Sequence, residues 1–242
     1  MGERRFYRAI MARSGLVSFR VVHKETDLYV QAPLDLSLKV SSWVIQARQA
    51  IELYIQSHPE FLSSRSPLAF DPFANPIIKQ MLEAGIAARV GPMAAVAGAI
   101  AEFIGRNILE QTPGEVIVEN GGDVFLTTKS PVTISIFAGP SPLSNKIAVK
   151  LDPKGRCLGV CTSSGTVGHS LSLGRADAVT VIAHSAALAD AMATSAANLV
   201  KKKSDIKLAL KTIKDVKGVL GGVVIKGDRL GAVGQIEIIP IT

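Results

Sequence analysis

Aromatic residues are scarce in this sequence of 242 residues. Phe, Trp and Tyr together make up 5% of the chain, and Trp occurs only once. Nucleic-acid-binding surfaces commonly stack bases on aromatic side chains set among basic ones, and no such interleaving is present here. The sequence therefore gives little support for nucleic-acid binding, and its many small residues favour close helix packing over an aromatic-lined cleft.

Cysteine is nearly absent as well, with only Cys157 and Cys161. If the segment between them is extended, four residues at about 3.3 Å each separate their Cα atoms by about 13 Å, whereas a disulfide requires less than about 7 Å. Two thiols alone do not form a zinc quartet. We expect two reduced, partly buried thiols. A redox or sulfur-carrying role for Cys161 is the alternative.

Long hydrophobic runs are also missing. Hydrophobic residues make up 48% of the chain, yet no uninterrupted run reaches the roughly 18 to 20 residues of a transmembrane helix. The first residues carry Arg4, Arg5, Arg8 and Arg13 and lack the apolar core of a secretory signal. We therefore expect a soluble, cytoplasmic protein without a membrane partner.

Positive charge is present in excess and is concentrated in one region. The net charge is +7. The lysines crowd into one stretch as Lys201, Lys202, Lys203, Lys207, Lys211, Lys214 and Lys217. Apolar residues at Ile206, Leu208, Leu210 and Ile213 predict an amphipathic helix there. Such a lysine face is usually just solvated, and attraction of an acidic partner or a phosphorylated ligand is the alternative.

The remaining pattern predicts an α+β fold, in which mixed or antiparallel sheets pack with helices. β-rich runs separated by turn signals predict strands at 17–22, 28–31, 116–119, 124–127, 132–137, 147–150, 178–183, 223–226 and 236–239. Helical periodicity predicts helices at 38–57, 77–87 and 93–109, and another after an N-cap at Ser185. No internal repeat or low-complexity linker occurs, so we expect a single domain over 1–242.

Three short segments carry residue types that suit a ligand or a metal ion. The first is the turn between two predicted strands, which reads Asn120, Gly121, Gly122 and Asp123. Its paired glycines permit positive φ and a bare backbone approach to a ligand. A simple hairpin turn would also explain this sequence.

The second segment is a predicted loop over 162–172 that is rich in hydroxyls and glycines. It has the properties of an anion cradle, but it lacks the lysine of a P-loop. The residues that would meet phosphate are Thr162, Ser163, Ser164, Gly165 and Gly168. His169 lies in the same loop and could accept a proton or donate a hydrogen bond to phosphate. A purely structural histidine is the alternative.

The third segment is the helix after Ser185, on which Asp190 and Thr194 lie four residues apart and share a face. A carboxylate and a hydroxyl can hold Mg²⁺, which completes its octahedron with water and substrate phosphates. An ordinary polar helix edge is the alternative. The adjoining hydroxyl-rich loop favours a metal–phosphate site.

In this order, the segments VENGGDVFL, CTSSGTVGHS and ADAVTVIAHSAALADAMATSA resemble the ApbE family of FAD:protein FMN transferases. The Ala-Asp-Ala-Met-Ala-Thr hexad is the most specific of them, and the resemblance is strongest over 93–194. The segments ERRFYR, ETDLYVQA and GPMAAVAG are similar to those of a short, cytoplasmic branch of the ApbE-like superfamily.

The resemblance implies an ApbE-like domain with a pocket for a flavin nucleotide, FAD or FMN, bordered by Gly121, Gly122 and Asp123. It also implies Mg²⁺ held by Asp190 and Thr194. In that family the protein transfers FMN from FAD to an acceptor protein.

By the same resemblance, His169 is the catalytic base that activates a threonine of the acceptor. Many members continue after this histidine with an Asp-Pro-x-Thr-Gly segment, which residues 170–174 replace here. A non-catalytic binding or accessory protein, with Cys161 as a functional thiol in sulfur metabolism, is the alternative function. The sequence leaves a homo-oligomer open.

Overall fold

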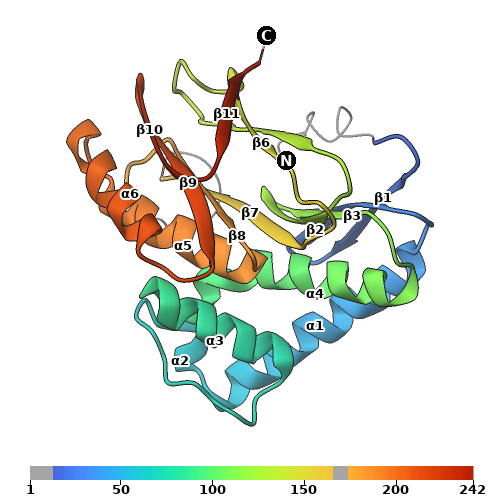
Figure 1. The fold of residues 1–242 in the computed structure, drawn as a ribbon. Helices are drawn as coiled ribbons and strands as arrows, with labels where there is room; N and C mark the ends of the chain where they lie inside the picture. Colours follow the sequence, from blue (N-terminus) through green and yellow to red (C-terminus); the bar gives the residue numbers. More distant parts are fainter. Residues whose placement is uncertain (1–12, 166–173, 242) are drawn as a thin grey trace.

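A large antiparallel sheet forms the middle layer of the computed structural model, which describes residues 13–165 and 174–241 (Figure 1). Its strand order is β1-β2-β3-β4-β7-β8-β9-β10. The strands are β1 (Val17–His23), β2 (Thr26–Ala32), β3 (Val116–Asn120), β4 (Asp123–Thr127), β7 (Leu158–Ser163), β8 (Ala178–Ala183), β9 (Val219–Lys226) and β10 (Arg229–Gly234). Antiparallel sheets packed with helices confirm the predicted α+β class.

A small second sheet covers one face of the large one. Its order is β11-β6-β5, with β5 at Val132–Ser135, β6 at Ile147–Leu151 and β11 at Glu237–Pro240. Buried side chains of both sheets, such as Leu126, Val149 and Ile182, form a shared apolar cluster. Burial of this cluster holds the two sheets together.

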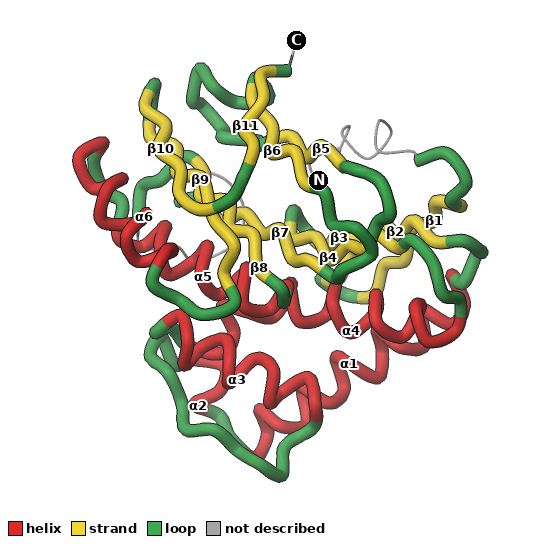
Figure 2. The backbone as a smooth tube through the Cα atoms, in the orientation of Figure 1, coloured by secondary structure: helices red, strands yellow, loops and turns green. Residues whose placement is uncertain are grey.

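Helices cover the opposite face of the large sheet, as the red and yellow layers of Figure 2 show. They are α1 (Ser37–Ser57), α2 (Glu60–Ser63), α3 (Pro76–Ala88), α4 (Val96–Gln111), α5 (Ala186–Leu199) and α6 (Ile206–Lys214), with short 3₁₀ turns η2 (Pro92–Ala95) and η3 (Lys203–Asp205). Within the described ranges, no single helix has both the length and the apolar character to cross a membrane. The bent pair α3 and η2–α4 meets that test jointly, by length and composition alone.

Three elements differ from the sequence prediction. The short helix α2 and the strands β7 and β10 were not predicted. Thr162 and Ser163, assigned to a loop, are the last residues of β7. β7 is hard to predict because it contains Gly159, where a Cβ would overlap the Cα of Ala186 at the start of α5. Close packing therefore selects a residue that disfavours strands.

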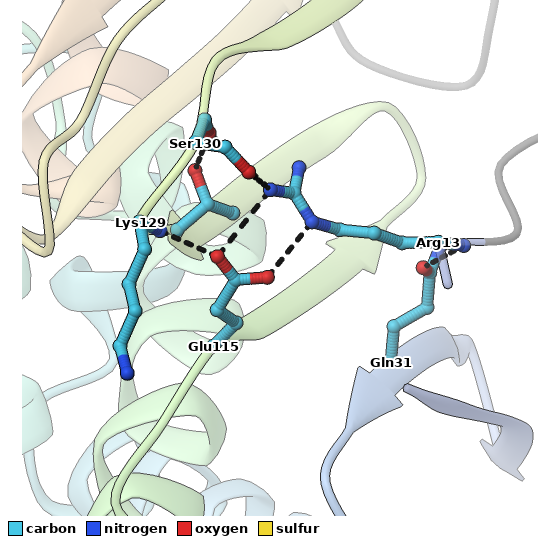
Figure 3. Close-up of polar contacts among 6 residues, drawn as sticks. Arg13, Gln31, Glu115, Lys129 and Ser130 are labelled. Carbon is cyan, nitrogen blue, oxygen red and sulfur yellow. Dashed lines mark hydrogen bonds and ion pairs between the residues drawn. The ribbon is translucent and has the colours of Figure 1, made fainter. Parts of the chain in front are cut away.

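An ion-pair cluster fastens the beginning of the described chain to the sheet (Figure 3). The guanidinium Nε of Arg13 lies 2.8 Å from Oε2 of Glu115, and the backbone N–H of Arg13 donates to Gln31. Glu115 also accepts the backbone N–H of Lys129. Burial raises the pKa of Glu115, but the Lys129 N–H and Arg13 outweigh it, so the pKa is lowered overall. The cluster thus joins four separate segments of the chain.

Candidate functional site

The candidate site lies where β4 and β7 meet the beginnings of α4 and α5. Asp123 is the first residue of β4 and follows the turn Gly121–Gly122, whose φ values are 68° and 104°. Both angles lie in the region that glycine favours, which fits a tight two-residue hairpin. The N–H of Gly122 donates to Glu119 at 2.7 Å, and Gly121 is exposed. The turn therefore directs Asp123 inward, toward the helices.

Asp190 reaches the same place from α5. Its Oδ2 accepts the backbone N–H of Gly98, in the first turn of α4, at 2.9 Å. A Cβ on Gly98 would overlap the carbonyl oxygen of Ala186 and lie 2.9 Å from Cβ of Asp190. Gly98 therefore permits close packing of two helix backbones, and that packing delivers its N–H to the carboxylate.

Asp123 and Asp190 both have raised pKa values, chiefly because of burial. Burial, and next the charge of Asp123, raise the pKa of Asp190 well above its ordinary value, although the N–H groups of Gly98 and Ala97 lower it. Burial raises the pKa of Asp123 to about 7, against the lowering effects of Cys161 and the Thr162 N–H. Raised pKa values at two neighbouring carboxyl groups mean that their joint ionisation is unfavourable without a compensating positive charge.

Two buried oxygens at this site lack a hydrogen-bond partner within the described residues: Oδ1 of Asp123 and Oγ of Ser163. Both residues are more than nine-tenths buried. Cys161 and Ser163 point to the same face of β7, because strand side chains alternate, and the Cys161 thiol contacts Ala186 of α5. These oxygens therefore lie on the helix side of the sheet, where Asp190 also lies.

Thr162 has a different orientation from its neighbours. Its Oγ1 lies 2.9 Å from Oγ1 of Thr180 on β8, on the other face of the sheet. The prediction that this hydroxyl meets phosphate therefore has no support from the position of its side chain. Its backbone N–H, by contrast, faces Asp123.

Thr194, Ser164 and Gly165 are the other candidate residues within the described ranges. Thr194 is half-buried, one helical turn after Asp190, whereas most of the alanines of α5 are buried. Ser164 is half-buried and Gly165 is exposed; the Gly165 N–H donates to Ala176 at 2.9 Å. Gly168 and His169 lie outside the described residues.

Oxygen donors make up the site, and they fit a hard cation such as Mg²⁺. The fit rests on the unpartnered Oδ1 of Asp123 beside the Asp190 carboxyl, because a cation would pair with both. Within the described residues, no group of three or more His, Cys, Asp or Glu side chains is arranged to hold a metal ion. The protein would therefore supply few ligands, which is typical of magnesium sites completed by water and phosphate.

Cys161 is fully buried and unsuited to be a nucleophile. Burial, followed by the charges of Asp123 and Asp190, raises the pKa of its thiol well above the ordinary range. Reactive cysteines have a lowered pKa and partial exposure. Both cysteines are free thiols, as predicted.

Glu102 was not singled out from the sequence. It is 1% exposed on α4, and its carboxylate accepts the Ser185 hydroxyl at 2.8 Å and the Ala186 N–H at 2.7 Å. Arg106, one turn later, pairs with it at 2.6 Å. Ser185 is the N-cap of α5, as predicted. The Glu-x-x-x-Arg spacing on an apolar helix was the available signal for a buried ion pair.

This fold is that of the ApbE flavin transferases. The apo form of Pseudomonas stutzeri flavinyl transferase ApbE matches with a TM-score of 0.59 and 14% identity, over 90% of this chain and 94% of that one. Flavin transferase ApbE from Vibrio cholerae matches with a TM-score of 0.57 and 11% identity, over 90% and 96%. At these identities the likeness establishes the fold alone.

The chain belongs to the family described as AbpE bacteria, whose model matches residues 8–218. A UPF0280 protein of Methanococcus aeolicus is 41% identical over 226 residues, which are 89% of this chain and 91% of that protein. Another, from Methanothermobacter thermautotrophicus, is 39% identical over 228 residues, 92% and 88% of the two chains. The resemblance seen in the sequence motifs is thereby confirmed.

Proposed function

We propose that this protein binds FAD with Mg²⁺ and transfers FMN from FAD to a hydroxyl group of an acceptor protein. The observation that carries the proposal is the pairing of the buried Asp123 with the half-buried Asp190. The pKa values of both are raised, and Oδ1 of Asp123 lacks a hydrogen-bond partner within the described residues. The shared fold with proteins named flavin transferases supports the reaction class.

Asp190 and Thr194 would hold the Mg²⁺, and Asp123 offers a further oxygen close by. When bound, the ion would polarise the diphosphate of FAD and neutralise the charge that develops on it. The exposed Gly121 and the half-buried Gly122 would border the nucleotide, and the buried Ser163 hydroxyl would donate to a phosphate oxygen.

His169 would accept the proton of the acceptor's threonine hydroxyl. The threonine oxygen forms a bond to the phosphorus of the FMN half, the bond between the two phosphates breaks, and AMP leaves. This assignment to His169 rests on the motif resemblance. The cytoplasmic location, the extent of the domain over 1–242 and a homo-oligomer stay predictions.

Incubation with FAD, Mg²⁺ and candidate acceptor proteins tests the proposal. We expect equal amounts of AMP and acceptor-bound FMN, measured by chromatography and mass spectrometry. Asp190→Asn and Thr194→Val should abolish both products, whereas Ser195→Ala, beside Thr194 on the same helix, should retain them. Absence of both FAD binding and AMP release would refute the proposal.

Cys161→Ser separates this proposal from the accessory-protein alternative. If Cys161 were the functional thiol, its loss would abolish function and Asp190→Asn would have little effect. Our proposal predicts the reverse, because the thiol is buried and its pKa is raised.

A further inference from the structure

Positive charge is strongly polarised in this molecule. Residues 201–217 contain seven lysines and two aspartates, a net charge of +5, while the whole chain carries +7. The other 225 residues therefore share a net charge of only +2. A local excess of this size creates a directed electrostatic field on one side of the protein.

Helix α6 presents this charge in an ordered row. Ile206, Ala209 and Ile213 are buried, and the helix packs on α5, β9 and β10. The opposite side exposes Lys207 and Lys211, with Lys214 one turn further. Among the described residues, no carboxylate lies within 4.0 Å of these three ammonium groups. Like charges four residues apart destabilise a helix, so this row opposes the stability of α6.

Two nearby acidic residues, Asp205 and Asp228, are committed to other groups, and the exposed Asp215 beside Lys214 makes no ion pair within 4.0 Å among the described residues. Asp205 accepts the backbone N–H groups of Lys201 and Lys202, both at 3.0 Å. Asp228 pairs with Lys203 at 2.6 Å. The positive charge of the row is therefore left for an external partner.

The charged region begins at the candidate site's own helix. Gly174 packs against Ala197 near the end of α5, where a Cβ would overlap the Ala197 carbonyl. The N–H of the next residue, Arg175, donates to Val200 at 2.6 Å, and Arg175 is exposed. Lys201 follows directly, so the basic residues continue from the end of the helix that carries Asp190 and Thr194.

We propose that this lysine face, defined as Arg175, Lys201, Lys202, Lys207, Lys211 and Lys214, binds an acidic segment of the acceptor protein. The inference rests on the proposed function, since it names the partner of that site. Charge complementarity favours a protein carboxylate cluster. Aromatic side chains that stack bases are absent from the face, and its exposed apolar residues are few, chiefly Leu208, which disfavours membrane insertion.

A binding assay without FAD or Mg²⁺ tests this face independently of transfer. The probe is a fluorescein-labelled peptide in which glutamates flank one threonine, and its control replaces each glutamate with glutamine. Fluorescence anisotropy should show salt-sensitive binding of the glutamate peptide. The triple variant Lys207→Glu, Lys211→Glu, Lys214→Glu should weaken it about tenfold or more. Circular dichroism and the melting temperature verify that the variant is folded.

The matched control places the same charge change around the small sheet: Lys129→Glu, Lys146→Glu, Lys154→Glu. It should retain binding. The inference would be overturned if both triple variants weakened binding equally, or if the glutamine peptide bound as tightly as the glutamate peptide. Tighter binding of poly(U) or anionic vesicles to the same face would overturn it as well. Loss of FMN transfer alone would refute the proposed function and leave this binding result intact.

Discussion

Gly98 is a residue at which the backbone of α4 packs directly against that of α5. A methyl group there would overlap the Ala186 carbonyl. Replacing an exposed helical glycine by alanine usually raises the free energy of unfolding by about 1 kcal/mol. Overpacking, by contrast, lowers the free energy of unfolding by about 1 to 3 kcal/mol. Gly98 therefore serves packing and ligand positioning together, since its N–H also holds Asp190.

We accordingly predict that Gly98→Ala lowers the free energy of unfolding by about 1 to 3 kcal/mol. Because the helices must separate, Mg²⁺-dependent stabilisation should fall as well. Urea unfolding with and without Mg²⁺ measures both effects. An unchanged or increased stability would show that the two backbones are less tightly packed than the structure indicates.

Asp123 gives the molecule a defined pH dependence. Its pKa is raised from 3.8 to about 7, chiefly by burial. The folded state therefore holds the proton more tightly than the unfolded chain. This stabilisation is complete below about pH 4 and is lost as the pH rises through about 7.

Asp123→Asn should remove this dependence, because asparagine has no proton to lose in this range. When the pH rises from about 5 to about 8 without Mg²⁺, the free energy of unfolding of the wild type should fall by on the order of 2 to 4 kcal/mol relative to that of the variant. Urea unfolding at both pH values provides the measurement, with the exposed Asp152→Asn as control. Parallel pH profiles for wild type and Asp123→Asn would contradict the raised pKa.

Helix α5 is the element that sets the site, and its beginning is fixed by Ser185 and Glu102. The Ser185 hydroxyl accepts the Leu188 N–H and donates to Glu102, which also accepts the Ala186 N–H. A carboxylate at a helix N-terminus also interacts favourably with the helix dipole. The orientation of Asp190 thus depends on a contact made one turn earlier.

Ser185→Ala should therefore cost about 1 kcal/mol of stability, and Glu102→Ala about 2 to 3 kcal/mol, because it leaves buried donors unpaired. The double variant should lose less stability than the sum of the two single losses, because both residues act on one contact. Chemical denaturation of the single and double variants measures the coupling. Glu110→Ala serves as control, because Glu110 is exposed and lies on α4 with Glu102. Fully additive losses would show that the two residues act separately.

The elements that sequence predicts well are those whose local and tertiary preferences agree. β8 was predicted at Ala178–Ala183, where the structure has it, because its apolar run has strand length and strand composition. β7 escaped prediction because Gly159, Cys161 and the hydroxyls after it disfavour a strand locally, and its place is set by pairing with β4 and β8.

The candidate site was only partly accessible from the sequence. The spacing of Asp190 and Thr194 and the turn before Asp123 were visible as separate motifs. Their meeting depends on the packing of α4 against α5 and on strand order, which no local pattern contains. Gly98 and Glu102 contribute through backbone and buried contacts that residue type alone does not indicate.

At the scale of the whole molecule, three layers place the candidate site between the helices and the large sheet, while α6 carries the positive charge at one side (Figure 1). Gly98 and Glu102, in the N-terminal half of the chain, hydrogen-bond to α5 in its C-terminal half. A ligand that engages Asp123 and Asp190 would therefore stabilise both halves together.

The central claim, that Asp123 and Asp190 belong to a site for Mg²⁺ and FAD, is tested most directly by the melting temperature of the protein with Mg²⁺ alone, FAD alone and both. We predict that the two together raise it more than the sum of their separate effects, and that Asp190→Asn removes this excess while Ser195→Ala preserves it. No increase with FAD and Mg²⁺ in the wild-type protein, or the same increase in Asp190→Asn, would contradict the claim.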